Sequence, residues 1–270
     1  MDPIRIFVGT DKWQRAAGAE LVLEHSIRQH SQRADIEITW MRSGDPGWEV
    51  SKDGGAVKGR QTWKVGDAVD SAWSGGRGSW ATPFSCFRFA VPELCQFEGR
   101  AIYLDADMLV LGDINDLWNQ DCLEGSSVKC SHRVRTDVMV IDCSKFGEPG
   151  GKPFASWWSI ADMKKKHLHI RQFLSRLGLY HVVDTSLDSL WNDCDGWGYE
   201  RGDNAQLIHY THALKGQPYR PYPNAKYPSQ FPYVTTSQKA GLLWWDTYLQ
   251  ALMKQHGEEE GTRIWNEAKK

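Results

Sequence analysis

The sequence predicts an α/β protein with a mostly parallel central sheet flanked by helices, and three observations lead to this prediction. Residues 4–8 alternate in character and are rich in β-forming side chains, which is typical of a first strand. Residues 14–30 carry apolar side chains at helical spacing, and residues 36–40 again have the composition of a strand. Strand, helix and strand in direct succession predict a βαβ unit, whose two strands run parallel.

The later segments add further elements to this sheet. Residues 84–94 have the pattern of a helix, and residues 101–104 form a short apolar strand. Apolar runs predict buried strands at residues 138–141 and 206–210. From residue 237 onward the apolar side chains suit a helical tail. We therefore expect a single α/β domain over residues 1–222, followed by a helical C-terminal extension over residues 223–270.

Residues 41–83 differ from the rest of the chain. This stretch holds nine glycines and four tryptophans and shows no sustained hydrophobic period. Loops of this length are either functional or disordered, and disordered segments are poor in aromatic side chains. The segment is therefore predicted to be a functional loop.

Composition excludes several classes of protein. With 41% hydrophobic and 24% charged residues among 270, the chain has the composition of a globular protein. Its net charge of −2 does not suit a nucleic-acid-binding protein. No run of about 20 apolar residues predicts a membrane span, and the N-terminus lacks the features of a signal peptide, so we expect a cytoplasmic protein. The six cysteines show no C-x-x-C spacing and are predicted to be free thiols.

An Asp-x-Asp motif follows the apolar run at residues 101–104. Alternate side chains of an extended chain point the same way, so Asp105 and Asp107 are expected to face one site while Ala106 turns away. Two adjacent carboxylates repel each other, and a divalent cation such as Mg²⁺ or Mn²⁺ removes that repulsion. Neither aspartate has an evident packing role in the sequence, so each is expected to be replaceable by alanine without loss of the fold.

Three other interpretations of these residues remain open. Haloacid-dehalogenase phosphatases also place Asp-x-Asp after an apolar strand, but near the N-terminus and followed by Gly-Thr, whereas here Met108 follows. A nucleotidyltransferase would require a glycine-rich basic loop near the N-terminus, and residues 9–12 are too short and too acidic for one. The 14 tryptophans also suit a non-catalytic carbohydrate-binding protein, in which flat rings stack on sugars.

Three separated motifs resemble glycosyltransferase family eight, which includes glycogenin and bacterial lipopolysaccharide galactosyltransferases. They are the start at Val8-Gly9-Thr10-Asp11, the stretch from Phe84 through Asp105-Ala106-Asp107 to Trp118, and Ile208-His209-Tyr210-Thr211 with the following Lys215. The resemblance implies a GT-A fold, a Mn²⁺-dependent Asp-x-Asp with Mg²⁺ as the alternative ion, and a UDP-sugar donor. It also implies transfer of a hexose, glucose or galactose by analogy, to a carbohydrate or other hydroxyl acceptor with retention of configuration.

The same resemblance assigns roles to individual residues. It implies metal ligation by Asp105, Asp107 and His209, and donor binding by Thr10, Asp11, Arg88, Ala106 and Lys215 together with the two aspartates. Asp184 and Asp188 are candidates for the carboxylate that retaining chemistry uses beneath the anomeric carbon, with Arg88 beside the donor sugar. Ordinary alternatives stay open: a helix cap or turn residue for either aspartate, a structural ion pair of Arg88 with Glu93 or Asp105, and a hydrogen-bonded core histidine for His209.

Overall fold

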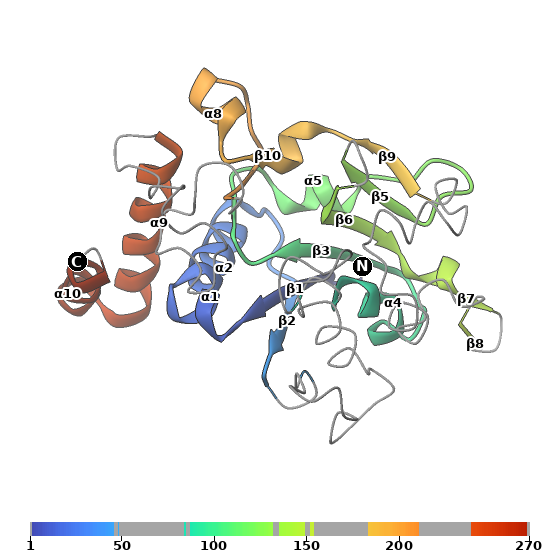
Figure 1. Ribbon diagram of the computed structural model, residues 1–270, viewed down its shortest axis with the longest axis horizontal. Coiled ribbons are helices and arrows are strands. Elements are labelled where there is room, and N and C mark those ends of the chain that lie inside the picture. The colour runs from blue at the N-terminus through green and yellow to red at the C-terminus, as the bar shows by residue number, and fades with distance from the viewer. Residues whose placement is uncertain are drawn as a thin grey trace, which may run out of the picture. The chain divides into compact units, whose positions relative to one another are not determined.

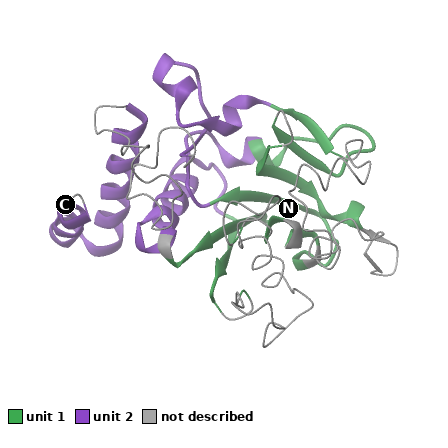
Figure 2. Ribbon diagram, viewed as in Figure 1, with its two compact units in different colours: residues 1–12, 35–105, 117–187 green, residues 13–34, 106–116, 188–270 purple. Residues whose placement is uncertain are grey.

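The computed structural model describes residues 2–45, 48, 84, 87–131, 135–148, 152–153, 183–210 and 239–268. Its contacts divide the chain into two compact units, which Figure 2 colours separately. Unit 1 consists of residues 1–12, 35–105 and 117–187, and unit 2 of residues 13–34, 106–116 and 188–270. The boundary predicted near residue 222 lies outside the described residues, so the domain limits stay a prediction.

Unit 1 is built on a six-stranded sheet with the strand order β2-β1-β3-β6-β5-β9 (Figure 1). β1 pairs in parallel with β2 and with β3, and β5 pairs in parallel with β9. β6 runs antiparallel to both β3 and β5. The predicted α/β class with a mostly parallel central sheet is therefore confirmed. The strands are β1 (Ile4–Asp11), β2 (Ile36–Ser43), β3 (Arg100–Asp105), β5 (Val128–Ser131), β6 (Arg135–Asp142) and β9 (Val183–Leu187).

The apolar composition of the central strands explains their position. Ile6 and Val8 of β1 are fully buried, as are Ile102 and Leu104 of β3. Near-continuous apolar runs of this kind are typical of strands covered on both faces. β2 lies at the edge of the sheet and alternates between buried and exposed residues, as a half-covered strand does.

The helix predicted over residues 84–94 is shorter than expected. The structure has a 3₁₀ helix, η1 (Phe87–Ala90), followed by one α-helical turn, α4 (Val91–Leu94). Pro92 fits this first turn because its missing N–H would have no helical partner there. The helix ends at Leu94, and Gln96 and Phe97, with φ angles of 54° and 59°, prevent its continuation. The described part of unit 1 also contains the short elements η2 (Cys143–Phe146), β7 (Gly147–Glu148) and β8 (Lys152–Pro153).

Unit 2 combines a small sheet with helices. Its three strands have the order β10-β11-β4, with β10 (Asp193–Cys194) parallel and β4 (Met108–Val110) antiparallel to β11 (Leu207–His209). A buried cluster that includes Ile208 and Trp244 joins this sheet to the helices. The helices are α2 (Ala19–His30), η4 (Ser189–Asn192), α8 (Trp197–Arg201), α9 (Lys239–His256) and α10 (Glu258–Ala268); α1 (Lys12–Ala16) and α5 (Ile114–Trp118) cross the unit boundaries.

Glycines interrupt two segments that were predicted to be continuous helices. The helix expected over residues 14–30 is split between α1 and α2 at Gly18, which has a φ of 84°. A Cβ at Gly18 would lie 2.5 Å from Cε2 of Tyr248, so the close approach of α9 also requires glycine here. The predicted helical tail is confirmed, but Gly257, with a φ of 86°, divides it into α9 and α10.

None of the helices in the described part of the chain is both long enough and apolar enough to cross a membrane.

Candidate metal centre

Asp105 is the last residue of β3, a strand that is buried from Ala101 onward. Parallel pairing with β1 places Gly9 opposite Asp105. The residues that follow Gly9, Thr10 and Asp11, therefore continue β1 beside this strand end, and both are buried. In open α/β sheets ligands collect at the carboxyl ends of parallel strands, which is where these residues lie.

The Asp105 carboxylate is held by two side chains of unit 1. Nη2 of Arg88 donates to Oδ1 at 2.9 Å and to Oδ2 at 3.1 Å. The hydroxyl of Tyr103, two residues earlier on the same face of β3, donates to Oδ1 at 2.6 Å. Arg88 also donates to Thr136 Oγ1 at 2.8 Å and lies 3.6 Å from Asp137. The carboxylate is thus fixed in one orientation.

Burial and neighbouring charges set the protonation states of Arg88 and Tyr103. Burial by itself would lower the pKa of Arg88, but Asp105, Tyr103 and Asp137 raise it above its ordinary value, so the guanidinium stays charged. Burial raises the pKa of the Tyr103 hydroxyl well above its usual range. The Tyr103 hydroxyl therefore keeps its proton and donates a hydrogen bond to Asp105. The structural ion pair between Arg88 and Asp105 is therefore present, whereas a role for Arg88 beside a donor sugar stays a prediction.

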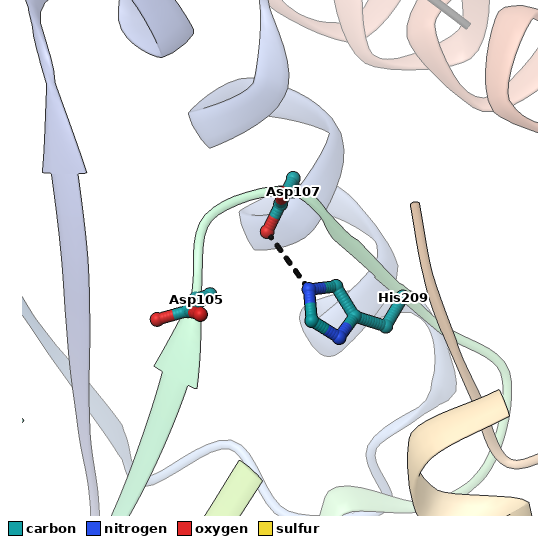
Figure 3. A group of neighbouring side chains, drawn as sticks. All are labelled: Asp105, Asp107 and His209. Atoms are coloured by element: carbon teal, nitrogen blue, oxygen red, sulfur yellow. Dashed lines mark ion pairs between the residues drawn. The ribbon is translucent and has the colours of Figure 1, made fainter. Parts of the chain in front are cut away.

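Asp107 and His209 are brought together within unit 2 by the pairing of β4 with β11. Met108 lies opposite His209 in the register, and the carbonyl oxygen of Asp107 accepts a hydrogen bond from the Tyr210 amide at 2.9 Å. Nε2 of His209 lies 3.4 Å from Oδ1 of Asp107 (Figure 3). Both side chains are almost completely buried, with 9% of Asp107 and 5% of His209 exposed.

Asp105, Asp107 and His209 form the one group with metal-binding potential found among the described residues. Each offers a ligand atom, and these three atoms lie within 4.8 Å of one another (Figure 3). Two carboxylates and one imidazole are a donor set that suits Mn²⁺ and related divalent ions. The residues present therefore fit the predicted metal, and Ala106, fully buried, connects the two aspartates.

The structure gives Asp184 and Asp188 local contacts. Asp184 in β9 is 2% exposed, accepts the amides of Ser186 and Leu123, and lies 3.1 Å from Nζ of Lys129. Burial alone would raise the pKa of Asp184, but these hydrogen bonds hold it below its ordinary value. Asp188 caps η4 by accepting the amide of Leu190 at 2.9 Å. The turn and capping interactions foreseen for both are present, and their catalytic roles stay predictions.

Other predicted residues remain without a structural description. Lys215 and most of residues 41–83 lie outside the described residues. Sequence reasoning, for its part, did not single out Tyr103, Asn192, Thr136 and Asp137, all of which contact predicted site residues. The period of a strand was a usable signal for Tyr103, which shares a face with Asp105. The other three come from distant segments, and nothing in the local sequence indicates their contacts.

Comparison with known proteins agrees with this architecture. No profile of a protein family matches the sequence. No curated protein matches it by sequence either. The bifunctional glycosyltransferase WbbM is similar over 91% of this chain and 52% of its own, with a TM-score of 0.53 and 11% identity. GlyE of Streptococcus pneumoniae TIGR4, a glycosyltransferase, is similar over 98% of this chain and 63% of its own, with a TM-score of 0.51 and 16% identity.

A third similar structure matches along nearly its whole length. The galactosyltransferase LgtC, solved with donor and acceptor sugar analogues, is similar over 88% of this chain and 96% of its own, with a TM-score of 0.50 and 16% identity. The chain thus spans between about half and two thirds of WbbM and GlyE but most of LgtC. At these identities the similarity defines the fold, which is a GT-A-like α/β fold found in glycosyltransferases.

Proposed function

We propose that the protein is a metal-dependent glycosyltransferase that transfers a hexose from a UDP-sugar to a hydroxyl acceptor with retention of configuration. The observation that carries the proposal is the grouping of Asp105, Asp107 and His209 after a central strand of a GT-A-like fold. LgtC, which has this fold, was solved with donor and acceptor sugar analogues. The three sequence motifs that resemble glycosyltransferase family eight add support for the donor and the stereochemistry.

The residues of the proposed metal centre have different roles. Asp105 is held by Arg88 and Tyr103, so its oxygens need little rearrangement to receive a ligand. Asp107 and His209 supply the remaining donor atoms. A bound Mn²⁺, or Mg²⁺ in its place, would neutralise charge on the departing diphosphate. We further propose that Thr10 and Asp11 contact the nucleotide and that Lys215 adds positive charge near the phosphates.

A phosphatase is less well supported by the contacts of Asp105. In that reaction the first aspartate of the motif attacks phosphorus, so its carboxylate must present a reactive oxygen. Here both oxygens of Asp105 accept hydrogen bonds from a charged guanidinium, which withdraws electron density from them. Oδ1 accepts from both Arg88 and Tyr103, so Oδ2, which accepts from Arg88 at 3.1 Å, is the oxygen at which metal ligation remains compatible with this geometry.

The test is release of the nucleotide diphosphate from a panel of nucleotide sugars, with Mn²⁺ or Mg²⁺ present and compared with activity on phosphate monoesters. We expect Mn²⁺-dependent hydrolysis of a UDP-sugar by the wild-type protein. Loss of a side chain that only hydrogen-bonds a metal ligand typically lowers metal affinity or activity about 10- to 100-fold, so loss of a ligand itself in Asp107→Asn or His209→Ala should lower activity by at least that much. His209→Ala should also narrow the preference for Mn²⁺ over Mg²⁺, because nitrogen is a softer donor than oxygen.

Asp203→Asn is a matched control, since Asp203 belongs to an exposed ion pair with Arg201 and should keep wild-type turnover. Wild-type turnover in Asp107→Asn at saturating metal would refute the metal assignment. Hydrolysis of phosphate monoesters without turnover of any nucleotide sugar would instead support a phosphatase.

A further inference from the structure

The imidazole of His209 contacts two oxygen atoms through its two ring nitrogens. Nδ1 lies 3.1 Å from Oδ1 of Asn192, and Nε2 lies 3.4 Å from Oδ1 of Asp107. An amide oxygen only accepts hydrogen bonds, so the contact with Asn192 requires the proton to reside on Nδ1. In the neutral ring this leaves a lone pair on Nε2, the nitrogen that faces Asp107.

This arrangement is what a metal ligand requires. A histidine binds a cation through an unprotonated nitrogen, and its other nitrogen usually donates to an oxygen that fixes the tautomer and the ring plane. The lone pair of Nε2 and the carboxylate of Asp107 face each other, so both could bind one cation. The contact with Asn192 therefore favours the tautomer in which the unprotonated nitrogen of His209 is the one that faces Asp107.

The backbone around Asn192 is tied to the strand that carries His209. Asn192 ends η4 and is followed at once by β10, in which Cys194 lies opposite His209. The amide of Asp195 donates to the carbonyl oxygen of His209 at 2.7 Å. At the other end of η4, the Asp188 side chain caps the helix through the amide of Leu190. All of these residues belong to unit 2, so one unit fixes the contact.

Burial strengthens the contact. Asn192 is 6% exposed and His209 is 5% exposed, so neither group can exchange the hydrogen bond for bulk water at low cost. The thiol of Cys194 donates weakly to the backbone carbonyl oxygen of Asn192 at 3.5 Å, which adds a further contact between η4 and β10.

We propose that Asn192 is a positioning residue of the metal centre, which holds His209 in the Nδ1–H tautomer and directs Nε2 at the ion, while Asp188 supports it by capping η4. The proposal rests on the proposed function in that it assumes a metal at Asp105, Asp107 and His209.

The experiment compares wild-type protein with Asn192→Ala, Asn192→Asp and the exposed control Asn204→Ala. Nitrogen-15 NMR of the histidine rings reports the His209 tautomer without metal, and calorimetric titration with Mn²⁺ reports affinity; melting temperatures show whether each variant is folded. We expect the Nδ1–H tautomer in wild type and a mixture in Asn192→Ala, with the dissociation constant for Mn²⁺ raised about 10- to 100-fold. Asn192→Asp keeps an acceptor for Nδ1–H and should retain the tautomer and most of the affinity.

The outcomes separate the two proposals. Wild-type protein that binds no Mn²⁺ would contradict the proposed function, whereas the tautomer measurement would still report on Asn192. If wild type binds Mn²⁺ and folded Asn192→Ala binds it equally well with an unchanged tautomer, the positioning role is wrong. Should Asn192→Ala not fold, an Nε2–H tautomer in wild-type protein, or lost affinity in folded Asn192→Asp, would overturn the proposal.

Discussion

Gly9 has no room for a side chain because of the hydroxyl that holds Asp105. A Cβ built on Gly9 would overlap the Tyr103 hydroxyl and would lie 3.1 Å from Cδ2 of Phe84. Gly9 does not have a left-handed backbone, so the penalty for Gly9→Ala is steric. Tyr103 is fully buried, so its ring cannot swing into solvent to relieve the overlap.

Two terms set the size of the effect. Overpacking a buried site costs about 1–3 kcal/mol. Displacing the Tyr103 hydroxyl also weakens its 2.6 Å hydrogen bond to the Asp105 carboxylate, and a hydrogen bond to a charged group contributes about 1.5–3 kcal/mol. We therefore expect Gly9→Ala to lower the free energy of unfolding by about 2.5–6 kcal/mol, and Tyr103→Phe by about 1.5–3 kcal/mol.

The double variant is the decisive measurement. Tyr103→Phe removes the overlapping oxygen and leaves Cζ, which would lie 3.3 Å from the new methyl group. Adding Gly9→Ala to Tyr103→Phe should then cost only about 1 kcal/mol, so the two changes are less than additive by about 1.5–5 kcal/mol. Urea unfolding of the four proteins measures this coupling. Additive costs would refute the argument that the Tyr103 hydroxyl is what requires glycine at position 9.

Two further predictions concern buried ion pairs. Arg88→Met should lower the free energy of unfolding by about 3–5 kcal/mol because the buried Asp105 carboxylate loses its charged partner. Arg201→Met, which breaks an exposed ion pair, should lower it by less than about 1 kcal/mol. Equal midpoints of urea unfolding for the two variants would contradict this prediction. Asp184→Asn should be destabilising at pH 7 by about 3–5 kcal/mol because Lys129 stays buried without its charged partner. The pKa of Asp184 is lowered in the folded state, so its contribution to stability is present above the unfolded pKa of about 3.9 and is lost as pH falls. The difference in free energy of unfolding between Asp184→Asn and wild type should therefore be smaller at pH 3 than at pH 7 in urea unfolding. A difference that does not change with pH would contradict this argument.

The parts of the fold that depend on local pattern were predictable. The apolar runs of β1, β3, β6 and β11 and the helical tail all lie where hydrophobic periodicity placed them. The helix breaks at Gly18 and Gly257 were not predicted, because a single glycine is compatible with a helix. At Gly18 the deciding factor is the ring of Tyr248, which comes from a segment more than 200 residues away.

In the candidate site, too, contacts set by local sequence pattern were predictable and contacts between distant segments were not. The period of a strand predicted that Asp105 and Asp107 lie close together, and the resemblance to a family predicted His209, which does lie beside them. The contact between Asn192 and His209 depends on the pairing of β10 with β11. Strand pairing between distant segments is a property of the whole fold, so no local pattern around Asn192 indicates it.

The two aspartates of the motif are therefore not equivalent, although the sequence presents them as a symmetric pair. Asp105 is bound to the charged Arg88 and to Tyr103, so it contributes to the stability of unit 1 with or without a metal. Asp107 faces His209, and a cation is the partner that would join these two groups most favourably. The expectation that alanine at either position leaves the fold intact must be revised for Asp105, because Asp105→Ala removes a charged partner of the buried Arg88 guanidinium. Loss of activity in an Asp105 variant would thus combine unfolding with metal loss, and Asp107 and His209 are the positions at which metal binding can be tested on its own.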